Sequence, residues 1–553
     1  MRLELYLVVA TLIVSTSTVV GQPADAIDDA FPNPIPFGTA RATLAPFATI
    51  PLSDGAQPRM TQLRPAYDGS GRLFLNDQRG PLYVITPDGA SITLYLDVRN
   101  VEPMITGGFS GGFHNFAFHP EFATNGKLYT FHGSNDVSQP LTYANANEVG
   151  YPGSVHGVLL EWTADDPTSD VFQGPAPRTV LRVEQQLNGH SGGGLSFDYS
   201  AAQEDPEYGI LYMTFGDGTL GEDLDDAAQN PRIANGKCLR LDPVAYTDPT
   251  TQDFRPFRIP NDNPFIDDAG VLDIIYAMGL RNTQRVSFDP AGIFRTPILA
   301  DIGQGVIEEI NLGVSGANYG WVRREGTFEY VQDRLVRSSP TPPEFTDPVA
   351  EYDHTEGIPN SSTAAITPGT ILRGPSAGAL EGAFIFGDIA GGRIFYIRDF
   401  ETYTQTATGG QDAIRELRLL DESGQQVDLR TDVLNSPRAD LRFGVAPDGA
   451  VFILNKRDGV LRTLTISKAC GPADLSSTGA TLPNQAGFAL PDGRIDLDDL
   501  GYFLGRWLAS AQEADLTTTG ATLEGTTGFG VPDGVVDLDD LGWFISVWLS
   551  GCS

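Results

Sequence analysis

Short runs of alternating apolar and polar residues, separated by Gly, Asp and Asn turns, fill most of the chain. Between about Leu44 and Ser467 a turn glycine is repeatedly followed by a strand-like segment, as in residues 71–75, 126–129, 209–212 and 449–453. A second segment often follows after another glycine, as in residues 80–85, 392–397 and 459–462. Period-two alternation between such turns predicts antiparallel hairpins. No convincing long helix interrupts them, so the pattern favours a β-propeller over a sandwich, and periodicity alone does not fix the number of blades.

After Cys470 the pattern changes to a tandem repeat. Residues 473–508 are followed by a second copy at 514–549, and counterparts such as Asp492 and Asp533 lie 41 positions apart (533 − 492). In each copy an Asp-Leu-Asp-Asp-Leu segment begins an amphipathic pattern, with Leu500, Phe503, Leu504 and Trp507 at i, i+3, i+4 and i+7. This spacing predicts one short helix per copy.

The N-terminus carries an apolar run over residues 5–20, preceded by Met1-Arg2 and followed by Gly21-Gln22-Pro23. This is typical of a secretory signal peptide, with cleavage after Gly21 or after Ala26. A membrane anchor is the alternative, although the run is short and contains Ser and Thr. We therefore expect a secreted, periplasmic or cell-surface protein.

Charge and length narrow the class further. The 553 residues exceed what one ordinary core supports, so more than one domain is expected. The formal net charge is −35, which repels phosphate backbones and attracts cations. Nucleic acid is therefore excluded as a partner, and calcium is favoured.

Cysteine usage agrees with an oxidising compartment. Of three cysteines, Cys470 and Cys552 bracket the C-terminal repeat, which suggests a disulfide. Cys238 lies in an alternating apolar stretch and is predicted to be a buried core thiol.

His190 is the histidine whose context suggests chemistry. It lies in Asn188-Gly-His-Ser-Gly-Gly-Gly194, a glycine-rich turn that enters the strand-like segment 195–197. Glycines allow a flat ligand to approach while one side chain projects, and histidine suits a general base near neutral pH. A loop histidine that stabilises a turn is the structural alternative.

Two further segments carry candidate ligands. Gly279-Leu-Arg-Asn282 places the planar guanidinium of Arg281 beside the amide of Asn282, a pair suited to carboxylate or carbonyl oxygens, with a surface ion pair as the alternative. Residues 300–312 combine a Gly-Gln-Gly turn with Glu308 and Glu309, which offer the hard oxygen ligands that calcium prefers.

The order of these motifs resembles the glucose/sorbosone dehydrogenase family. The matching segments are Asn-x-His-x-Gly-Gly, Phe-Gly-Asp-Gly (215–218), Gly-Lys-x-Leu-Arg-Leu-Asp (236–242), Asn-Pro-Phe (263–265), Gly-Leu-Arg-Asn, Asp-Ile-Gly-Gln, Glu-Glu-Ile-Asn-Leu and Asn-Tyr-Gly-Trp. The family includes soluble sugar dehydrogenases that use pyrroloquinoline quinone (PQQ), together with Hedgehog-interacting-protein-like propellers. The resemblance covers about residues 50–465 and implies a six-bladed β-propeller with the quinone across one face.

The resemblance also implies roles for single residues. His190 would take the proton of the sugar C1 hydroxyl, while Arg281 and Asn282 would contact the reactive side of the quinone. Backbone oxygens of Gly303 and Gln304 would hold a calcium ion beside the quinone carbonyl. Glu309 matches a position linked to a second, structural calcium, and Arg373 matches a cationic cofactor contact.

This chain departs from the dehydrogenases at three places. Gly189 replaces an acidic neighbour of the base, and Ser110 stands where glutamine or an acid is often found. The segment Arg438-Ala-Asp-Leu-Arg442 resembles the Hedgehog-interacting-protein-like branch more than the arginine pair that binds the carboxylates of the cofactor.

The C-terminal copies resemble dockerin duplicated calcium loops. Aspartates of the first copy match positions five, nine and twelve of an EF-hand-type loop, and the second copy repeats them. The first ligands would be Asp474 and Asp515, which lie 18 residues before Asp492 and Asp533 instead of four (492 − 474; 533 − 515). Helix N-termini stabilised by carboxylates are the alternative. The predicted calcium ligands are Asp474, Asp492, Asp496, Asp499, Asp515, Asp533, Asp537 and Asp540.

The sequence therefore predicts an all-β, six-bladed propeller followed by a small helical module with duplicated calcium loops. The expected divisions are a signal peptide (1–21), a leader (22–44), the propeller (45–468) and the dockerin-like repeat (469–553). The expected function is oxidation of an aldose to its lactone with PQQ and calcium, with an unidentified electron acceptor and a cohesin-like or cell-surface anchoring partner. A non-catalytic propeller that binds a glycan or a protein is the rival, and a lactonase would need a carboxylate metal cage that the sequence does not provide.

Overall fold

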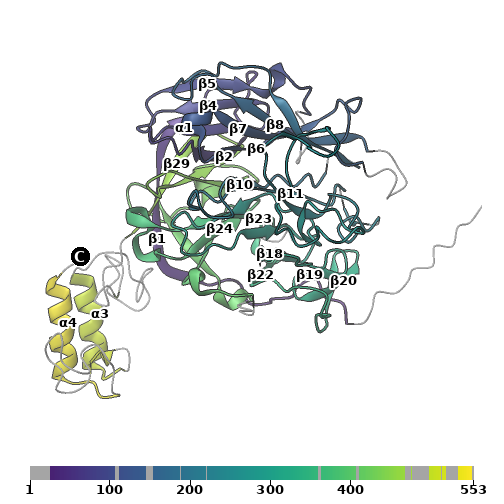
Figure 1. The fold of residues 1–553 in the computed structure, drawn as a ribbon. Helices are drawn as coiled ribbons and strands as arrows, with labels where there is room; N and C mark the ends of the chain where they lie inside the picture. Colours follow the sequence, from purple (N-terminus) through teal and green to yellow (C-terminus); the bar gives the residue numbers. More distant parts are fainter. Residues whose placement is uncertain are drawn as a thin grey trace, which may run out of the picture.

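The structure is a computed structural model that describes residues 25–105, 111–144, 153–186, 189–219, 221–223, 225–358, 363–405, 410–467, 475, 497–511, 514–517 and 534–550 (Figure 1). The predicted signal peptide, Ser110, Cys470 and Cys552, and the predicted ligands Asp474, Asp492, Asp496 and Asp533 lie outside these residues. None of the described helices is both long and apolar enough to cross a membrane.

The described chain is mostly β, as the alternation predicted. Its strands are β1 (Phe37–Thr49), β2 (Met60–Pro65), β3 (Leu73–Asp77), β4 (Pro81–Ile85), β5 (Ile92–Asp97), β6 (Phe113–Phe118), β7 (Lys127–Ser134), β8 (Val155–Thr163), β9 (Arg178–Gln185), β10 (Leu195–Phe197), β11 (Leu211–Phe215), β12 (Lys237–Leu241), β13 (Tyr246–Thr247), β14 (Phe254–Arg255), β15 (Ile275–Met278), β16 (Val286–Ser287), β17 (Ile298–Asp301), β18 (Ile307–Leu312), β19 (Arg324–Glu325), β20 (Phe328–Gln332), β21 (Leu335–Ser338), β22 (Ala350–Asp353), β23 (Ile366–Ile371), β24 (Phe384–Asp388), β25 (Ile394–Ile397), β26 (Arg415–Leu420), β27 (Arg442–Val445), β28 (Val451–Leu454) and β29 (Val460–Ile466). The α-helices are α1 (Phe122–Asn125), α3 (Leu497–Leu508) and α4 (Leu538–Ser550). Short 3-10 turns are η1 (Val98–Asn100), η2 (His354–Glu356), η3 (Gly374–Leu380), η4 (Phe400–Thr402) and η5 (Gln411–Ala413), and η6 (Leu429–Val433) is a π-turn.

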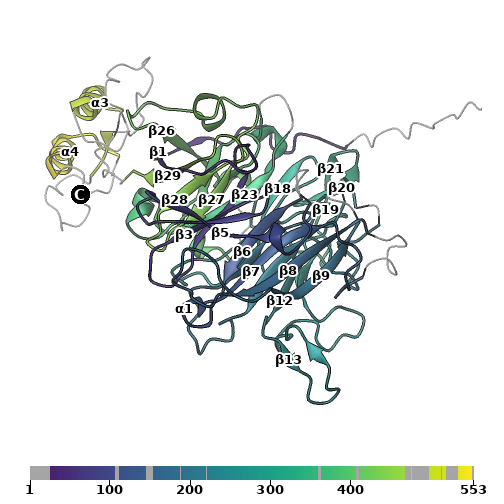
Figure 2. The same ribbon diagram turned by 90° about the horizontal axis from the view of Figure 1, so that it is seen from above.

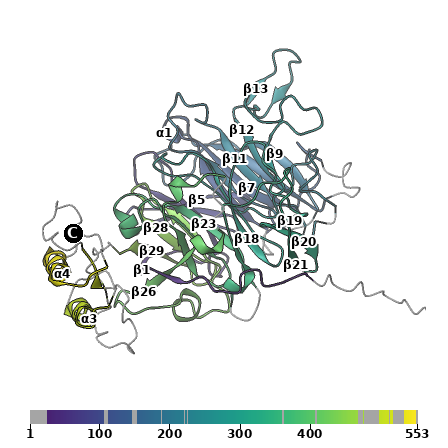
Figure 3. The ribbon, with the colours of Figure 1, turned by 90° about the horizontal axis from the view of Figure 1, so that it is seen from below.

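The strands assemble in antiparallel groups of four. Strands β6-β7-β8-β9, β10-β11-β12-β15 and β16-β17-β18-β22 each form a separate sheet. A 12-stranded sheet contains the groups β2 to β5, β23 to β26, and β27-β28-β29-β1. These groups are joined by parallel pairing of β1 with β26 and of β2 with β27. The hairpin β13–β14 projects from this body (Figures 2 and 3).

The first strands of the groups follow one another around a common axis. Strand β2 contacts β6, β6 contacts β10, β10 contacts β16, β16 contacts β23, and β23 contacts β27, which returns to β2. The ends of these strands therefore bring loops from all six groups toward one axis, where a site can form.

The apolar cores lie between neighbouring groups. One core joins Ile298 and Ile310 to Phe384 and Phe395, and others join β2–β5 to β6–β9 and β6–β9 to β10–β15. Full burial of such a side chain contributes about 1.5–3 kcal/mol, so each group is stabilised by its neighbours. Cys238 lies in one of these cores, fully buried, and burial raises its pKa to about 12. The predicted core thiol is confirmed.

Strand β1 closes the arrangement. It pairs antiparallel with β29, with Leu44 opposite Leu464. The first strand of the chain therefore completes the group whose other members, β27, β28 and β29, are the last three strands. Both leucines are buried in the same core.

Helices α3 and α4 pack against each other beside the sheets (Figure 1). The rings of Phe503 and Phe544 stack with centroids 4.2 Å apart, and Leu500 and Trp507 pack around them. An equivalent hydrogen bond occurs within each copy. Leu475 N donates to Asp499 Oδ1 in the first copy, and Leu516 N donates to Asp540 Oδ1 in the second, both at 2.7 Å. The predicted helix in each copy, with its apolar side, is confirmed.

Candidate active site

His190 and Asp217 meet where two loops cross at the ends of β10 and β11. His190 precedes β10, and Asp217 follows β11 in the Phe-Gly-Asp-Gly segment. The backbone oxygens of His190 and Arg281 lie 2.2 and 2.8 Å from where a Cβ on Gly216 would stand. Only glycine allows this close approach of the chains, so the motif positions the aspartate beside the histidine.

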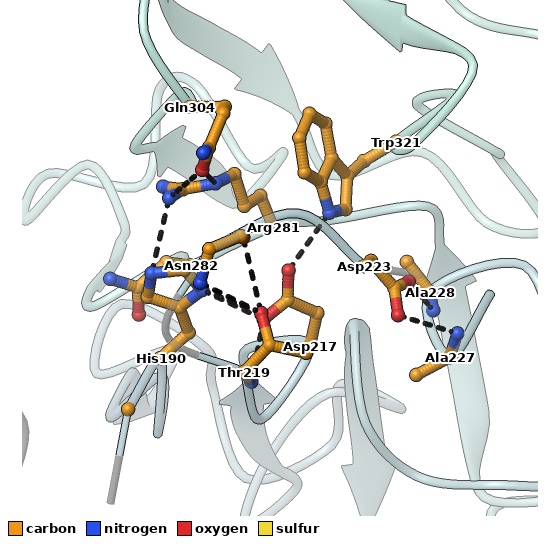
Figure 4. Close-up of polar contacts among 12 residues, drawn as sticks. His190, Asp217, Thr219, Asp223, Ala227, Ala228, Arg281, Asn282, Gln304 and Trp321 are labelled. Carbon is orange, nitrogen blue, oxygen red and sulfur yellow. Dashed lines mark hydrogen bonds and ion pairs between the residues drawn. The ribbon is translucent and has the colours of Figure 1, made fainter. Parts of the chain in front are cut away.

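The two side chains form a hydrogen-bonded pair (Figure 4). His190 Nδ1 lies 2.8 Å from Asp217 Oδ1. Because a carboxylate only accepts, Nδ1 carries the proton and Nε2 keeps its lone pair. Burial, followed by the positive charge of Arg281, lowers the pKa of His190 below its usual value. The imidazole is therefore neutral at neutral pH, which is the form that acts as a base.

Asp217 is itself held from three sides. Burial alone would raise its pKa, but the hydrogen bond from His190, the positive charge of Arg281 and the hydrogen bond from Thr219 N outweigh that effect and lower it, so it stays ionised. Trp321 Nε1 donates to Asp217 Oδ2 at 2.9 Å, and the backbone N and the hydroxyl of Thr219 donate to Oδ1 at 3.0 Å. These bonds fix the carboxylate that fixes the histidine.

Arg281 faces the free nitrogen of His190. Its Nη2 lies 3.1 Å from His190 Nε2, and its guanidinium carbon lies 5.5 Å from the centroid of the Trp321 ring. The other guanidinium nitrogens donate to the backbone oxygens of Ile302 and Gly303 at 2.9 and 2.6 Å, and to the side-chain oxygen of Gln304. These three oxygens converge on one cation, and Figure 4 shows the contact between Arg281 and Gln304.

Asp301, at the end of β17, holds the loop that carries Arg281. Its Oδ2 accepts from Arg281 N at 2.7 Å and its Oδ1 accepts from Asn282 N at 2.8 Å. Burial raises the pKa of Asp301 to about 6. The Asn282 side chain accepts from Gly192 N at 3.3 Å, which ties this loop to the glycine-rich turn after His190.

A large cavity opens in front of His190 and Arg281. Its empty space totals about 1930 Å³, part of it open to solvent. Asp440 is the one carboxylate among the described lining residues, whereas the cationic lining residues are Arg59, Arg79, Arg281, Arg334, Arg438, Arg442, Lys456 and Arg457. In a chain of net charge −35, this concentration of positive charge suits an anionic ligand.

Glu308 and Glu309 point to different partners from adjacent positions of β18. Glu308 Oε1 lies 2.6 Å from His354 Nε2. Glu309 accepts from Asn311 Nδ2 at 2.9 Å and from Gly326 N at 2.6 Å, and burial followed by the charge of Asp301 raises its pKa well above the usual value. In the register of the sheet Glu309 is opposite Asp301 on β17 and Glu351 on β22. Among the described residues no group of three acidic, histidine or cysteine side chains has the geometry to hold a metal ion.

Arg373 does not join these residues. Arg373 follows the C-terminal end of β23, whereas the cavity-lining residues Thr363 and Ala364 precede its N-terminal end. Its guanidinium pairs with Asp289 at 2.5 Å and with Glu401 at 2.6 Å. Its position gives no support to the predicted cofactor contact.

The described aspartates of the C-terminal module accept hydrogen bonds from the backbone. Besides the bonds already given for Asp499, Asp540 Oδ2 accepts from Asp537 N at 2.8 Å and Asp515 Oδ2 accepts from Gly534 N at 2.5 Å. Asp537 Oδ1 accepts from Asp539 N at 2.8 Å. Carboxylates in such positions stabilise the turns before the helices, and their role as calcium ligands stays a prediction.

The structure therefore brings His190, Arg281, Asn282, Gly303 and Gln304 together. Asp217 and Trp321 lie in two of the family motifs given above, but the sequence did not predict a role for either residue. The sequence signal that could have indicated a functional role for Asp217 is an acid between two glycines at the end of an apolar strand-like segment.

Comparisons with known proteins show the family and the fold of this chain. Residues 60–461 match the family model described as Glucose / Sorbosone dehydrogenase. The HIPL1 protein of Arabidopsis thaliana is 28% identical over 366 residues, covering 60% of this chain and 51% of its own length. The Hedgehog-interacting protein of Mus musculus is 27% identical over 329 residues, covering 58% and 40%. The chain thus spans about half the length, or less, of these curated relatives.

A solved structure supports the fold. The PQQ-bound form of aldose sugar dehydrogenase from Streptomyces coelicolor aligns with a TM-score of 0.50 at 18% identity, covering 77% of this chain and 99% of that one. The family model covers most of the chain and contains every residue of the described cavity except Arg59. The chain belongs to the glucose/sorbosone dehydrogenase family.

Proposed function

We propose that this protein is an exported, PQQ-dependent oxidoreductase that oxidises an aldose to its lactone on a six-bladed β-propeller. The observation that carries the proposal is the neutral His190, oriented by Asp217, at the wall of a cavity lined by cations. PQQ carries three carboxylates, so the basic lining suits it. The closed sequence of first strands from β2 to β27 supports six blades.

The chain's own residues would perform the proton transfer. A sugar C1 hydroxyl placed at His190 Nε2 would give up its proton there, and Asp217 would stabilise the imidazolium that forms. Since Arg281 Nη2 lies 3.1 Å from Nε2, its guanidinium must turn toward a ligand oxygen when the hydroxyl arrives. When bound, the quinone would supply the acceptor for the hydride that leaves C1.

The cation site proposed for calcium fits in part. Calcium prefers oxygen ligands, and the oxygens of Ile302, Gly303 and Gln304 already converge on a positive charge. That charge is the Arg281 guanidinium. Calcium held by Gly303 and Gln304 would therefore require Arg281 to release these oxygens, and it would lie in the same cavity as the cofactor.

The remaining parts of the proposal concern export and anchoring. The apolar segment 5–20 supports a signal peptide over residues 1–21, followed by a leader over 22–44. The propeller would cover residues 45–468. The 41-residue repeat supports a dockerin-like module over 469–553, which would bind calcium and a cohesin-like or cell-surface partner.

A binding propeller without catalysis is the second candidate. One observation favours it: Nδ1 and Nε2 of His190 both have protein partners, so the network is complete without a ligand. In that case the basic cavity would bind an acidic glycan or protein segment.

Reconstitution with PQQ and calcium separates the two candidates. We expect saturable binding of PQQ in equilibrium dialysis and reduction of an artificial dye with at least one sugar of an aldose panel. A protein that binds PQQ and oxidises no aldose would contradict the enzymatic proposal. A protein that binds no PQQ but retains acidic oligosaccharides would support the binding propeller.

A further inference from the structure

A second, smaller cavity adjoins the large one and shares Gln284, Arg442 and Lys456 with it. Thr61 of β2, Arg285 next to β16 and Arg442 of β27 also line it, so it lies at the axis that the first strands surround. It has room for little more than one water-sized group. No carboxylate is among the described residues that line it, whereas three of them are cations.

Arg285 is the residue that makes this cavity unusual. Its side chain is buried, with 7% of the residue exposed, and no described residue accepts a hydrogen bond from its guanidinium. It lines the small cavity and also a further one, which Arg64 lines too. Burial, then the like charges of Arg442 and Arg64, lowers the pKa of Arg285 well below its usual value.

Within the described part of the chain, its two cationic neighbours hydrogen-bond to neutral groups. Arg442 Nη2 donates to Gln284 Oε1 at 3.0 Å, and Lys456 Nζ donates to Gln78 Oε1 at 2.8 Å. The nearby acid, Asp440, is paired with Arg457 at 2.5 Å and with Arg438 at 3.5 Å. Among the described residues, therefore, no carboxylate forms an ion pair with any of these three cations.

Arg240 shows how this chain treats a buried arginine elsewhere. It is 1% exposed, and its guanidinium pairs with Glu207 and Asp262 at 2.7 Å and with the side chain of Asn263 at 2.9 Å. Burial of a charge costs several kcal/mol unless a counter-charge or hydrogen bonds compensate it. Arg240 has that compensation, and no described residue gives it to Arg285.

We propose that a small monovalent anion binds in this cavity, held by Arg285, Arg442 and Lys456. Its size limits it to a halide or a one-carbon carboxylate. A free ion such as chloride or formate is one source of this charge, and a carboxylate arm of a ligand in the adjoining large cavity is the other. We commit to the free ion, because the cavity is small and the imbalance of charge exists in the protein alone.

The test compares thermal unfolding of the full chain, without cofactor, in sodium gluconate, chloride and formate at constant ionic strength. Gluconate is too large for the cavity. We expect chloride or formate to raise the unfolding midpoint by about 2 °C or more over gluconate, since an ion that binds only the folded state stabilises it. Arg285→Gln should abolish this difference, and in gluconate its midpoint should equal or exceed that of the unmodified protein.

Arg240→Gln is the matched control. It removes a buried arginine that has carboxylate partners, so its midpoint should fall in all three salts while the response to chloride or formate persists. A crystal soaked in bromide should show an anomalous peak beside Arg285. Equal anion responses in both variants, or an Arg285→Gln midpoint in gluconate as low as that of Arg240→Gln, would overturn the proposal. Stabilisation by PQQ that needs Arg285, without any effect of chloride or formate, would assign the site to a carboxylate of the larger ligand.

Discussion

At the scale of single residues, the protonation of His190 decides what the site can do. The proton on Nδ1 is fixed by Asp217, and the lone pair on Nε2 faces Arg281 and the cavity. The same nitrogen would receive the sugar proton in the proposed reaction. Substitutions of the two partners therefore have different consequences.

His190→Ala should lower the turnover of the reconstituted enzyme by about 10²–10⁴, which is the usual contribution of a positioned base. PQQ binding should change little, because the base acts on the sugar. Steady-state dye reduction and equilibrium dialysis measure the two quantities separately. His119→Gln, a histidine near the end of β6 that does not line the large cavity, is the control and should retain turnover. Loss of PQQ binding along with turnover would show that His190 holds the cofactor.

Asp217→Asn should lower kcat and also move the acid limb of the pH profile. The Asp217 carboxylate raises the pKa of His190 against burial and Arg281, so removal of its charge lowers that pKa further. The limb of kcat/KM that reports His190 deprotonation should therefore shift to lower pH, while kcat falls by about 10²–10⁴ because the imidazolium loses its partner. Asp289→Asn, which affects the Arg373 pair, should leave the profile in place. An unshifted profile in Asp217→Asn would contradict the assigned role.

The sequence predicted the residues of this site that lie within short motifs. His190 and Arg281 each stand beside glycines, and such local signals are visible without a structure. The role of Asp217 depends on contacts with residues 27 positions before it and 104 positions after it, which no local pattern reveals. The cofactor contact at Arg373 stays a prediction, and its motif likewise does not show that Asp289 and Glu401 pair with it.

At the scale of elements, a row of buried carboxylates crosses one sheet. Asp301 on β17 is opposite Glu309 on β18, and Glu309 is opposite Glu351 on β22. Burial raises the pKa of Glu351 to about 7. Its two oxygens accept from the backbone N and the hydroxyl of Thr327. Ionisation of these buried carboxyl groups should therefore lower the free energy of unfolding.

Glu351→Gln should stabilise the protein at pH 8 and have little effect at pH 4. The folded pKa of Glu351 is raised above the unfolded value near 4.3, so the folded state binds the proton more strongly. The ionisation cost is absent below the unfolded pKa and complete above about pH 7, where it reaches about 3–4 kcal/mol. Chemical denaturation at the two pH values, in excess chelator, measures the difference. An equal effect at both values would show that packing, and not charge, controls this position.

Asp540→Ala tests the C-terminal module. The carboxylate accepts from Leu516 N, Thr517 N and Asp537 N, so its removal should cost about 1–2 kcal/mol of local stability. If calcium binds as predicted, isothermal titration of the full chain should also lose one binding event. Asp289→Asn, outside the module, should retain every event. Unchanged calcium binding in Asp540→Ala would show that this carboxylate only stabilises a helix terminus.

Strand and helix prediction succeeded where the pattern was local. The segments 71–75 and 449–453 became β3 and β28, and the i, i+3, i+4, i+7 pattern became α3. The parallel pairings of β1 with β26 and of β2 with β27 were not predictable, since they depend on how distant groups meet.

At the scale of the whole molecule, β1 links the two ends of the described β region. Leu44→Ala should destabilise the protein by about 2–5 kcal/mol, because Leu44 is 5% exposed and packs in a core with Leu464. Leu94→Ala on β5, where the side chain is 47% exposed, is the control and should change stability by less than about 0.5 kcal/mol. Denaturant unfolding measures both, and similar midpoints for the two variants would contradict the importance of this closure.

The closure by β1 also sets an order of events in time. Thr463 donates to the backbone oxygen of Ala45 across 418 residues of chain, so β1 emerges before every other described strand and finds its partner in the last of them. Contacts between such distant segments form slowly, since a long loop must close before they stabilise anything. Until then β1 has an unpaired edge that invites pairing with other chains. The appearance of β29, and not the synthesis of any earlier group of strands, is therefore the step at which this arrangement of sheets becomes stable.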